Sequence, residues 1–201
     1  MQKLRFVGLS GFATVGKDLF FSILSSNYPS ARFSLGDVLK AEVRQKILNE
    51  DGVDILNCNS QDKKKIRPKL VKYGTDKRRE TEGKYFTDKM DLIIKNTFTL
   101  SKIPVITDIR YKEFENDEIE WLKNDLGGVL VYIKKYKIIS GEKVYTEAPN
   151  ESEKKNDPLL RENADYTIDW QEVEKAEDFT AIKNNLAPHI KKFIDWYSKV
   201  L

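Results

Sequence analysis

The sequence predicts a three-layer α/β fold, in which helices flank a central parallel sheet. Short apolar runs alternate with amphipathic segments along the 201 residues, and the first run, residues 4–10, leads into a loop that starts at Gly11. The pair Asp108 and Arg110 directly follows a later β-branched run. Because ligands bind outside the carboxyl ends of strands in such sheets, we expect the site where these two features meet.

In the first half of the chain, apolar residues at helical spacing predict helices, and short apolar runs predict strands. The helix around Pro68 is expected to end at Gly74, because glycine often closes a helix. The stretch 50–65 is polar and is expected to be irregular. The predicted strands are 4–10 and 31–35, and the predicted helices are 17–27, 36–49, 65–72 and 84–100.

The second half continues the alternation, with one interruption. Residues 134–163 carry many charges, together with Gly141, Pro149 and Pro158, and lack sustained periodicity, so we expect a small lid-like excursion there. The last helix has a continuous apolar face that suits either the core or a homodimer. The predicted strands are 103–107, 128–133 and 166–170, and the predicted helices are 113–124 and 179–200.

The composition indicates a soluble globular protein, expected to form a single domain over residues 1–201. With 35 basic and 32 acidic residues the net charge is only +3, which argues against a stable nucleic-acid partner or membrane binding. The lone Cys58 excludes an internal disulfide. No signal peptide is visible and no apolar run reaches the roughly 18 residues of a membrane span, so we expect a cytoplasmic protein.

The loop from Gly11 to Lys17, here called the glycine loop, has the composition of a phosphate-binding site. Its two glycines allow the backbone N–H groups to surround an anion, Lys17 adds a positive charge, and the following helix contributes its N-terminus. The predicted ATP-binding residues are Gly11, Ala13, Thr14, Val15, Gly16, Lys17 and Asp18.

Asp18 departs from the usual pattern, which has a serine or threonine that ligates Mg²⁺. A carboxylate beside a triphosphate would be repelled unless a cation lies between them. Asp18 is therefore expected either to hold Mg²⁺, directly or through water, or to turn toward basic groups of the protein. A third interpretation is a helix-start carboxylate that stabilises the helix dipole.

Four stretches resemble, in this order, the phage deoxynucleoside monophosphate kinases of the P-loop nucleoside monophosphate kinase superfamily. They are GFATVGKD, IRPKLVKYGTDKRRE at 66–80, VITDIRYKEFE at 105–115, and SE at 152–153 leading to ADYTIDW at 164–170. The resemblance implies a P-loop kinase fold and phosphoryl transfer from ATP, with Mg²⁺, to a deoxynucleoside 5′-monophosphate, in the host cytoplasm if the chain is phage-encoded. Family members tend to have a histidine just before Ser-Glu, whereas this chain has PNESE.

The resemblance also implies roles for particular residues. Lys17, Asp108 and Arg110 would be catalytic, and residues 36–100 would bind the monophosphate. Asp108 has a structural alternative, because carboxylates at strand ends often cap the following loop or helix. Arg161 would be a lid arginine in the region 134–163. Of the adjacent Arg78 and Arg79 we expect one to act rather than both, because neighbouring charges often form a solvated face. The arginines expected on the monophosphate are Arg67, Arg78, Arg79 and Arg110.

Two other functions stay open. A kinase of a hydroxyl acceptor, on a modified base in DNA or on a small molecule, would need Asp108 as a base, whereas an acceptor phosphate is already ionised and needs none. The chain could also be a nucleotide-binding module without turnover, although its intact Lys17, Asp108 and Arg110 argue against this. The one histidine, His189, lies far from every motif.

Overall fold

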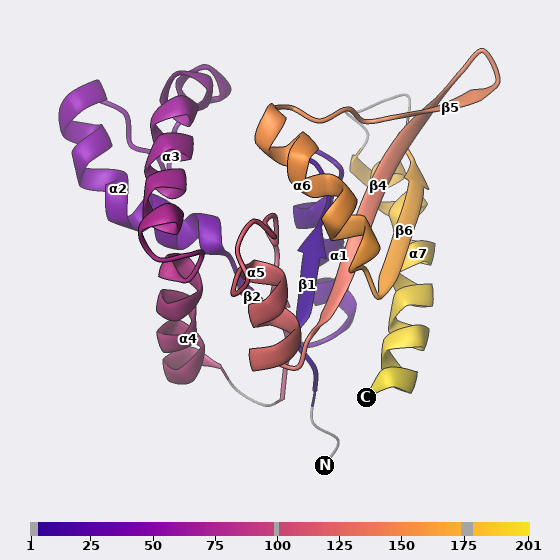
Figure 1. The fold of residues 1–201 in the computed structure, drawn as a ribbon. Coiled ribbons are helices and arrows are strands. Elements are labelled where there is room, and N and C mark those ends of the chain that lie inside the picture. The colour runs from indigo at the N-terminus through magenta and orange to yellow at the C-terminus, as the bar shows by residue number, and fades with distance from the viewer. Residues whose placement is uncertain (1–3, 99–100, 174–178) are drawn as a thin grey trace.

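The computed structural model describes residues 4–98, 101–173 and 179–201, and it shows an α/β fold. Within these residues six strands form one sheet in the order β2-β3-β1-β4-β5, with β6 paired to β4 (Figure 1). All pairs are parallel except β4 with β5, which is antiparallel. The predicted fold class is confirmed, with a mostly parallel sheet. The strands are β1 Val7–Ser10, β2 Ser30–Phe33, β3 Ile103–Ile106, β4 Val129–Ile139, β5 Glu142–Tyr145 and β6 Tyr166–Gln171.

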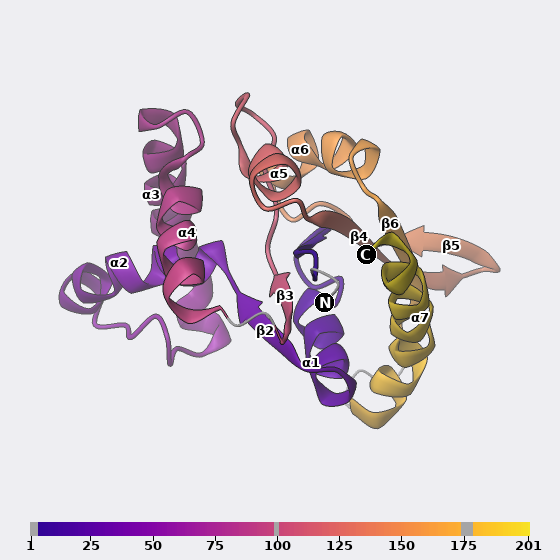
Figure 2. The same cartoon turned by 90° about the horizontal axis from the view of Figure 1, so that it is seen from below.

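Helices cover both faces of the sheet (Figure 2). One core packs α1 and α7 against β1, β4 and β6, and the other packs α2, α4, α5 and α6 against the opposite face. A third, smaller core joins α2 to α3, which stand to one side of the sheet in Figure 1. The helices are α1 Lys17–Asn27, α2 Leu35–Asp51, α3 Ser60–Glu80, α4 Tyr85–Thr97, α5 Glu118–Glu120, the π-helix η1 Trp121–Asp125, α6 Glu151–Glu162 and α7 Phe179–Val200.

The strand register determines where a site can form. Val7 of β1 lies opposite Val105 of β3 on one side and Val129 of β4 on the other. Since these three strands run in the same direction, their carboxyl ends meet at one edge of the sheet. The glycine loop after β1 and the pair Asp108 and Arg110 after β3 therefore lie at the same edge.

Helix α3 is much longer than predicted. It begins at Ser60, where the side chain of Asn59 accepts hydrogen bonds from the N–H groups of Gln61 and Asp62, and it continues through Pro68 and Gly74 to Glu80. The expected end at Gly74 is therefore wrong, and the irregular stretch expected over 50–65 is shorter than predicted, because α2 ends at Asp51 and α3 begins at Ser60. Gly74 serves packing instead, since a Cβ atom there would lie 2.8 Å from Cδ1 of Leu39 in α2.

In contrast to α3, two predicted helices are shorter than expected. The helix expected over 113–124 begins only at Glu118 and becomes π-helical at Trp121. The reason is Asp117, whose carboxylate accepts hydrogen bonds from the N–H groups of Glu113 and Phe114 and holds the preceding segment as a loop. The helix expected over 84–100 ends at Thr97, and its last two predicted positions, 99 and 100, lie outside the described residues.

The region 134–163 is ordered secondary structure and not the irregular excursion that the sequence indicated. Strand β4 continues to Ile139 and turns back at Ser140 and Gly141, whose φ angles are +53° and +84°, into β5. The carbonyl of Lys135 accepts a hydrogen bond from the N–H of Thr146, which follows β5. The carbonyl of Tyr136 accepts one from the N–H of Glu172, which follows β6. Successive carbonyls of a strand point to its two opposite edges. Strand β5 therefore pairs along the same edge of β4 as β1 does, and β6 pairs along the other edge.

In the parts of the chain that the structure describes, no helix combines the length and the apolar character that a bilayer crossing requires.

Candidate functional site

The glycine loop is held in shape by contacts with β4 and β6. Gly11 and Gly16 have φ angles of +119° and +104°, which favour glycine. A Cβ atom at Gly11 would lie 2.3 Å from the carbonyl oxygen of Ile133, and one at Gly16 would lie 3.0 Å from Cζ2 of Trp170. Trp170 also donates from Nε1 to the carbonyl of Val15 at 2.8 Å. From the sequence, Trp170 could be assigned only to a strand. No spacing pattern links it to Val15, which lies 155 residues earlier in the chain.

Helix α1 starts at the end of this loop with its anion-binding groups available. Its N-cap is Gly16, and no side chain caps its first turn, so the N–H groups and the positive end of the helix dipole suit an anion. The Lys17 side chain is buried and its Nζ donates to the carbonyls of Gly11 at 2.5 Å and Phe12 at 2.8 Å. Burial, and then the nearby Arg110, lower the pKa of Lys17 to about 8.

Asp18 turns toward a basic group, as one of the three interpretations expects. Its side chain is 86% exposed, and Oδ1 lies 3.6 Å from a guanidinium nitrogen of Arg32, which also pairs with Asp37 at 2.6 Å. No group of three or more acidic, histidine or cysteine side chains that could hold a metal occurs in the described part of the chain. A role of Asp18 with Mg²⁺ stays a prediction.

Asp108 fastens the end of β3 to the start of α2. One carboxylate oxygen accepts from the N–H of Leu35 at 2.9 Å, and the other accepts from the N–H of Gly36 at 2.7 Å and from the hydroxyl of Ser34 at 2.9 Å. A Cβ atom at Gly36 would lie 2.9 Å from the carboxylate. Asp108 therefore caps a helix start, as in the structural alternative, but this helix precedes it in the chain and does not follow it. A catalytic role for Asp108 stays a prediction.

The glutamate of the Ser-Glu pair at 152–153, to which the sequence assigned no role, lies where the site residues converge. Glu153, in the first turn of α6, accepts a hydrogen bond from the N–H of Ala13 in the glycine loop at 2.9 Å. Its other oxygen lies 3.3 Å from Arg110, 3.5 Å from Arg67 and 3.2 Å from the side-chain amide of Asn150. The Glu153 side chain is only 9% exposed. We refer to these five residues as the Glu153 cluster.

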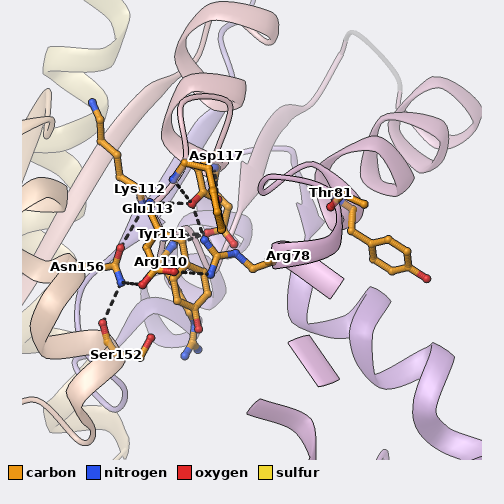
Figure 3. Close-up of polar contacts among 12 residues, drawn as sticks. Arg78, Thr81, Arg110, Tyr111, Lys112, Glu113, Asp117, Ser152 and Asn156 are labelled. Carbon is orange, nitrogen blue, oxygen red and sulfur yellow. Dashed lines mark hydrogen bonds and ion pairs between the residues drawn. The ribbon is translucent and has the colours of Figure 1, made fainter. Parts of the chain in front are cut away.

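A second ionic cluster forms around Arg78, which reaches from the end of α3 toward the loop before α5 (Figure 3). Its guanidinium pairs with Asp117 at 2.5 Å and Glu113 at 3.3 Å, and it stacks 3.6 Å from the ring centroid of Tyr111. Burial, and then Asp117, raise the pKa of the neighbouring Glu118 to about 8. These five residues form the Arg78 cluster.

The predicted pair of adjacent arginines is separated by this arrangement. Arg78 is buried and Arg79, the next residue on α3, is exposed. A cavity of about 440 Å³ is bordered by Arg78, Arg67 and Arg110, together with Ala13 and Glu153. Arg79 is not among the residues that border it. Three of the four arginines predicted on the monophosphate therefore face one cavity, which both clusters border.

A smaller cavity, of about 240 Å³, borders the glycine loop at Phe12 and Val15. Lys134, Lys135 and Arg161 give it a basic lining. Arg161 is placed by its own helix and by β4, since its Nε lies 2.7 Å from the carboxylate of Asp157 and 3.1 Å from the hydroxyl of Tyr132. The predicted lid arginine thus lies beside the glycine loop, in a cavity other than the one that Arg67 and Arg110 face.

Comparisons with known proteins place few limits on this chain. No family model matches it, and no curated protein matches it either. Among solved structures, a shikimate kinase from Acinetobacter baumannii, in complex with shikimate, aligns with 95% of this chain and 93% of its own, at 16% identity and a TM-score of 0.43. A likeness of this degree carries no inference about activity, so function must be argued from the site itself.

Proposed function

We propose that the protein transfers the γ-phosphoryl group of ATP to the phosphate of a deoxynucleoside 5′-monophosphate, which yields ADP and the diphosphate. The observation that carries the proposal is the convergence of a glycine-loop N–H group and two arginines, Arg67 and Arg110, on one carboxylate beside a 440 Å³ cavity. Such a point suits an anion that passes from a donor on the loop to an acceptor held by the arginines.

The reaction needs little from the protein except position and charge. An oxygen of the acceptor phosphate attacks the γ-phosphorus, the bond to the β,γ-bridging oxygen breaks, and its electron pair leaves with ADP. The attacking oxygen is already ionised, so no proton has to be removed. Lys17 and the start of α1 would bind the donor phosphates, and Arg67 and Arg110 would neutralise and orient the acceptor phosphate.

The placement of Asp108 favours a phosphate acceptor over a hydroxyl acceptor. A hydroxyl would need a base, and both oxygens of this carboxylate accept hydrogen bonds from the start of α2. A base needs an oxygen lone pair directed at the acceptor hydroxyl, and each oxygen of Asp108 already uses a lone pair in these hydrogen bonds. A phosphate acceptor makes no such demand, so a capping Asp108 is compatible with it.

The wall of the large cavity also suits a nucleoside. Ile66, Leu70 and Phe86 give it apolar surface, which a base and a sugar can contact. Arg78 adds no net positive charge there, because Asp117 and Glu113 neutralise it. We therefore assign the phosphate to Arg67 and Arg110 and the nucleoside to the part of the cavity near Arg78. The deoxyribose is supported only by the family resemblance.

The donor nucleotide would use the other side of the glycine loop. The smaller cavity offers three cationic side chains, those of Lys134, Lys135 and Arg161, to the phosphates of ATP. Mg²⁺ is usually held by one or two carboxylates and by substrate phosphates, and Asp18 offers an exposed carboxylate next to Lys17 that fits this role. A bound Mg²⁺ would neutralise phosphate charge.

A matched pair of acceptors tests the proposal. ADP release would be measured with ATP, Mg²⁺ and each deoxynucleoside 5′-monophosphate, and in parallel with the same deoxynucleosides lacking the phosphate. We expect release with at least one monophosphate, none with its parent deoxynucleoside, and none in Lys17→Ala. Equal rates with the parent deoxynucleoside would identify a hydroxyl acceptor and overturn the proposal, as would a monophosphate rate no higher than that of Lys17→Ala.

A further inference from the structure

We infer that Glu153 takes the place of a substrate phosphate in the protein without nucleotide, and that its carboxylate must leave the glycine loop when ATP binds. Glu153 would then set the affinity for the nucleotide and control when the acceptor arginines become available. The inference rests on the proposed function only in requiring that the glycine loop binds ATP. It goes beyond that function by giving a role to a residue that the reaction itself does not require.

The contacts of Glu153 are those that a phosphate would make. One oxygen accepts from a glycine-loop N–H at 2.9 Å, and the other lies within 3.5 Å of two guanidinium groups. Backbone N–H groups of such loops and arginine side chains are the usual protein partners of phosphate oxygens. A carboxylate and a phosphate therefore compete for the same donors.

The Lys17 side chain of the same loop also finds its hydrogen-bond partners within the protein. Lys17 donates to two carbonyls of its own loop, at 2.5 and 2.8 Å. Arg110 opposes the charge on Lys17 and lowers its pKa, whereas Glu153 acts in the opposite direction and stabilises that charge. Asp108 cannot replace Glu153, because its oxygens are bound to the start of α2. Glu153 is therefore the carboxylate that balances the cations of this site.

Helix α6 does not need this carboxylate to keep its first turn. Asn150 is the N-cap, and its side-chain oxygen accepts from the N–H of Glu153 at 2.9 Å. A glutamate at this third position often bonds back to the N-cap N–H in a capping box. Here it reaches instead to Ala13, 140 residues away, and to the side chain of Asn150. Glu153 can thus change partners while the helix start stays capped.

Electrostatics makes the exchange obligatory. The phosphates of ATP and the carboxylate are both negative, so they repel each other when they are close, and they compete for the same N–H and guanidinium donors. When phosphates occupy the glycine loop, Glu153 has to withdraw. Its departure frees Arg67 and Arg110 from their shared partner, so that they can bind the acceptor phosphate.

The test compares two glutamine substitutions in the same helical turn. Glu153→Gln removes the charge with little change in shape, and Glu151→Gln is the matched control, because the Glu151 side chain is 91% exposed and pairs only with Lys154 at 3.9 Å. Calorimetric titration with a non-hydrolysable ATP analogue and Mg²⁺ would give the dissociation constants. We expect Glu153→Gln to bind the analogue about ten-fold more tightly than wild type, and Glu151→Gln to bind as wild type does.

Unchanged or weaker binding by Glu153→Gln would overturn the inference, because the carboxylate would then be neutral or helpful to nucleotide binding. Thermal unfolding of each variant checks that it is folded. If Glu153→Gln does not fold, Glu153→Asp keeps the charge but withdraws it by one methylene, and it should also bind more tightly. The proposed function can fail separately: tighter analogue binding without phosphorylation of any monophosphate would leave this inference intact and remove the assigned acceptor.

Discussion

The Glu153 cluster and the Arg78 cluster border the same cavity and combine arginines with carboxylates, but they differ in burial. In the first, the Glu153 side chain is 9% exposed, but its partners Arg67 and Arg110 are 48% and 36% exposed and lie 3.5 and 3.3 Å from the carboxylate. In the second, Arg78 and Asp117 are 5% and 0% exposed and lie 2.5 Å apart.

This difference separates a cluster that can exchange partners from one that cannot. Ion pairs open to solvent contribute about 0 to 1 kcal/mol, so a ligand can replace either partner at little cost. Breaking a buried pair from one side costs about 3 to 5 kcal/mol, because a charge is left without a partner. The Glu153 cluster is thus suited to bind and release phosphate, and the Arg78 cluster is suited to hold the cavity wall.

The largest effect is expected from breaking the buried cluster. Arg78→Met should lower the free energy of unfolding by about 3 to 5 kcal/mol, because Asp117 would remain buried without its counter-charge. Urea denaturation measures this loss. The double variant Arg78→Met/Asp117→Asn should recover part of the stability. If Arg78→Met were as stable as wild type, the two clusters would not differ in the way proposed.

An effect of intermediate size is expected from pH. The pKa of Lys17 is lowered to about 8 by burial and then by Arg110, so the lysine is charged below pH 8 and loses its charge above it. The value of kcat/KM for ATP should therefore fall above pH 8, approaching ten-fold per pH unit. In Lys17→Arg the fall should disappear, since arginine stays protonated in this range.

The pKa of Glu118 in the Arg78 cluster is raised to about 8 as well, so a second variant has to show which of the two residues causes the fall in kcat/KM. Glu118→Gln removes that titration. The fall above pH 8 should persist in this variant whatever its rate. A profile that became flat in Glu118→Gln would assign the titration to the buried cluster and contradict the role given to Lys17.

The smallest effect on stability is expected at the open cluster. Arg67→Gln should change the free energy of unfolding by less than about 1 kcal/mol, because the guanidinium is half exposed and lies 3.5 Å from Glu153. The KM for the monophosphate should nevertheless rise about ten-fold if this arginine binds the acceptor phosphate. Lys64→Gln, an exposed charge removal on the same helix, is the matched control. An unchanged KM would remove Arg67 from the acceptor site.

Local patterns were sufficient for the central part of the fold. The strand before Gly11 and the helix after Lys17 follow from an apolar run, a glycine and helical spacing, and the structure places α1 at the predicted residues 17–27. The sequence also indicated that the glycine loop and the pair Asp108 and Arg110 share one edge of the sheet, as the strand register shows. Signals for the missed elements were present. Ser140-Gly141, directly after two isoleucines, is typical of a hairpin turn, and Asn150 three residues before Glu153 is typical of a helix start.

The contacts that define the site could not be predicted in this way. Glu153 and Ala13 are 140 residues apart, and Arg78 and Asp117 are 39 apart. No spacing rule connects such pairs, because their proximity depends on how helices pack across the sheet. The sequence likewise indicated that one of the adjacent Arg78 and Arg79 would act rather than both, but only the packing of α3 shows which one is buried and which exposed.

The bond from Trp170 to Val15 has a consequence for the order in which the protein can be made. The glycine loop is among the first segments to be synthesised, yet the indole that supports it comes 155 residues later, and β1 has its partners in β3 and β4, about a hundred residues downstream. Pairings this distant slow folding, because a long chain has to close before they form. On the ribosome, the loop would therefore lack its final support until β6 had emerged.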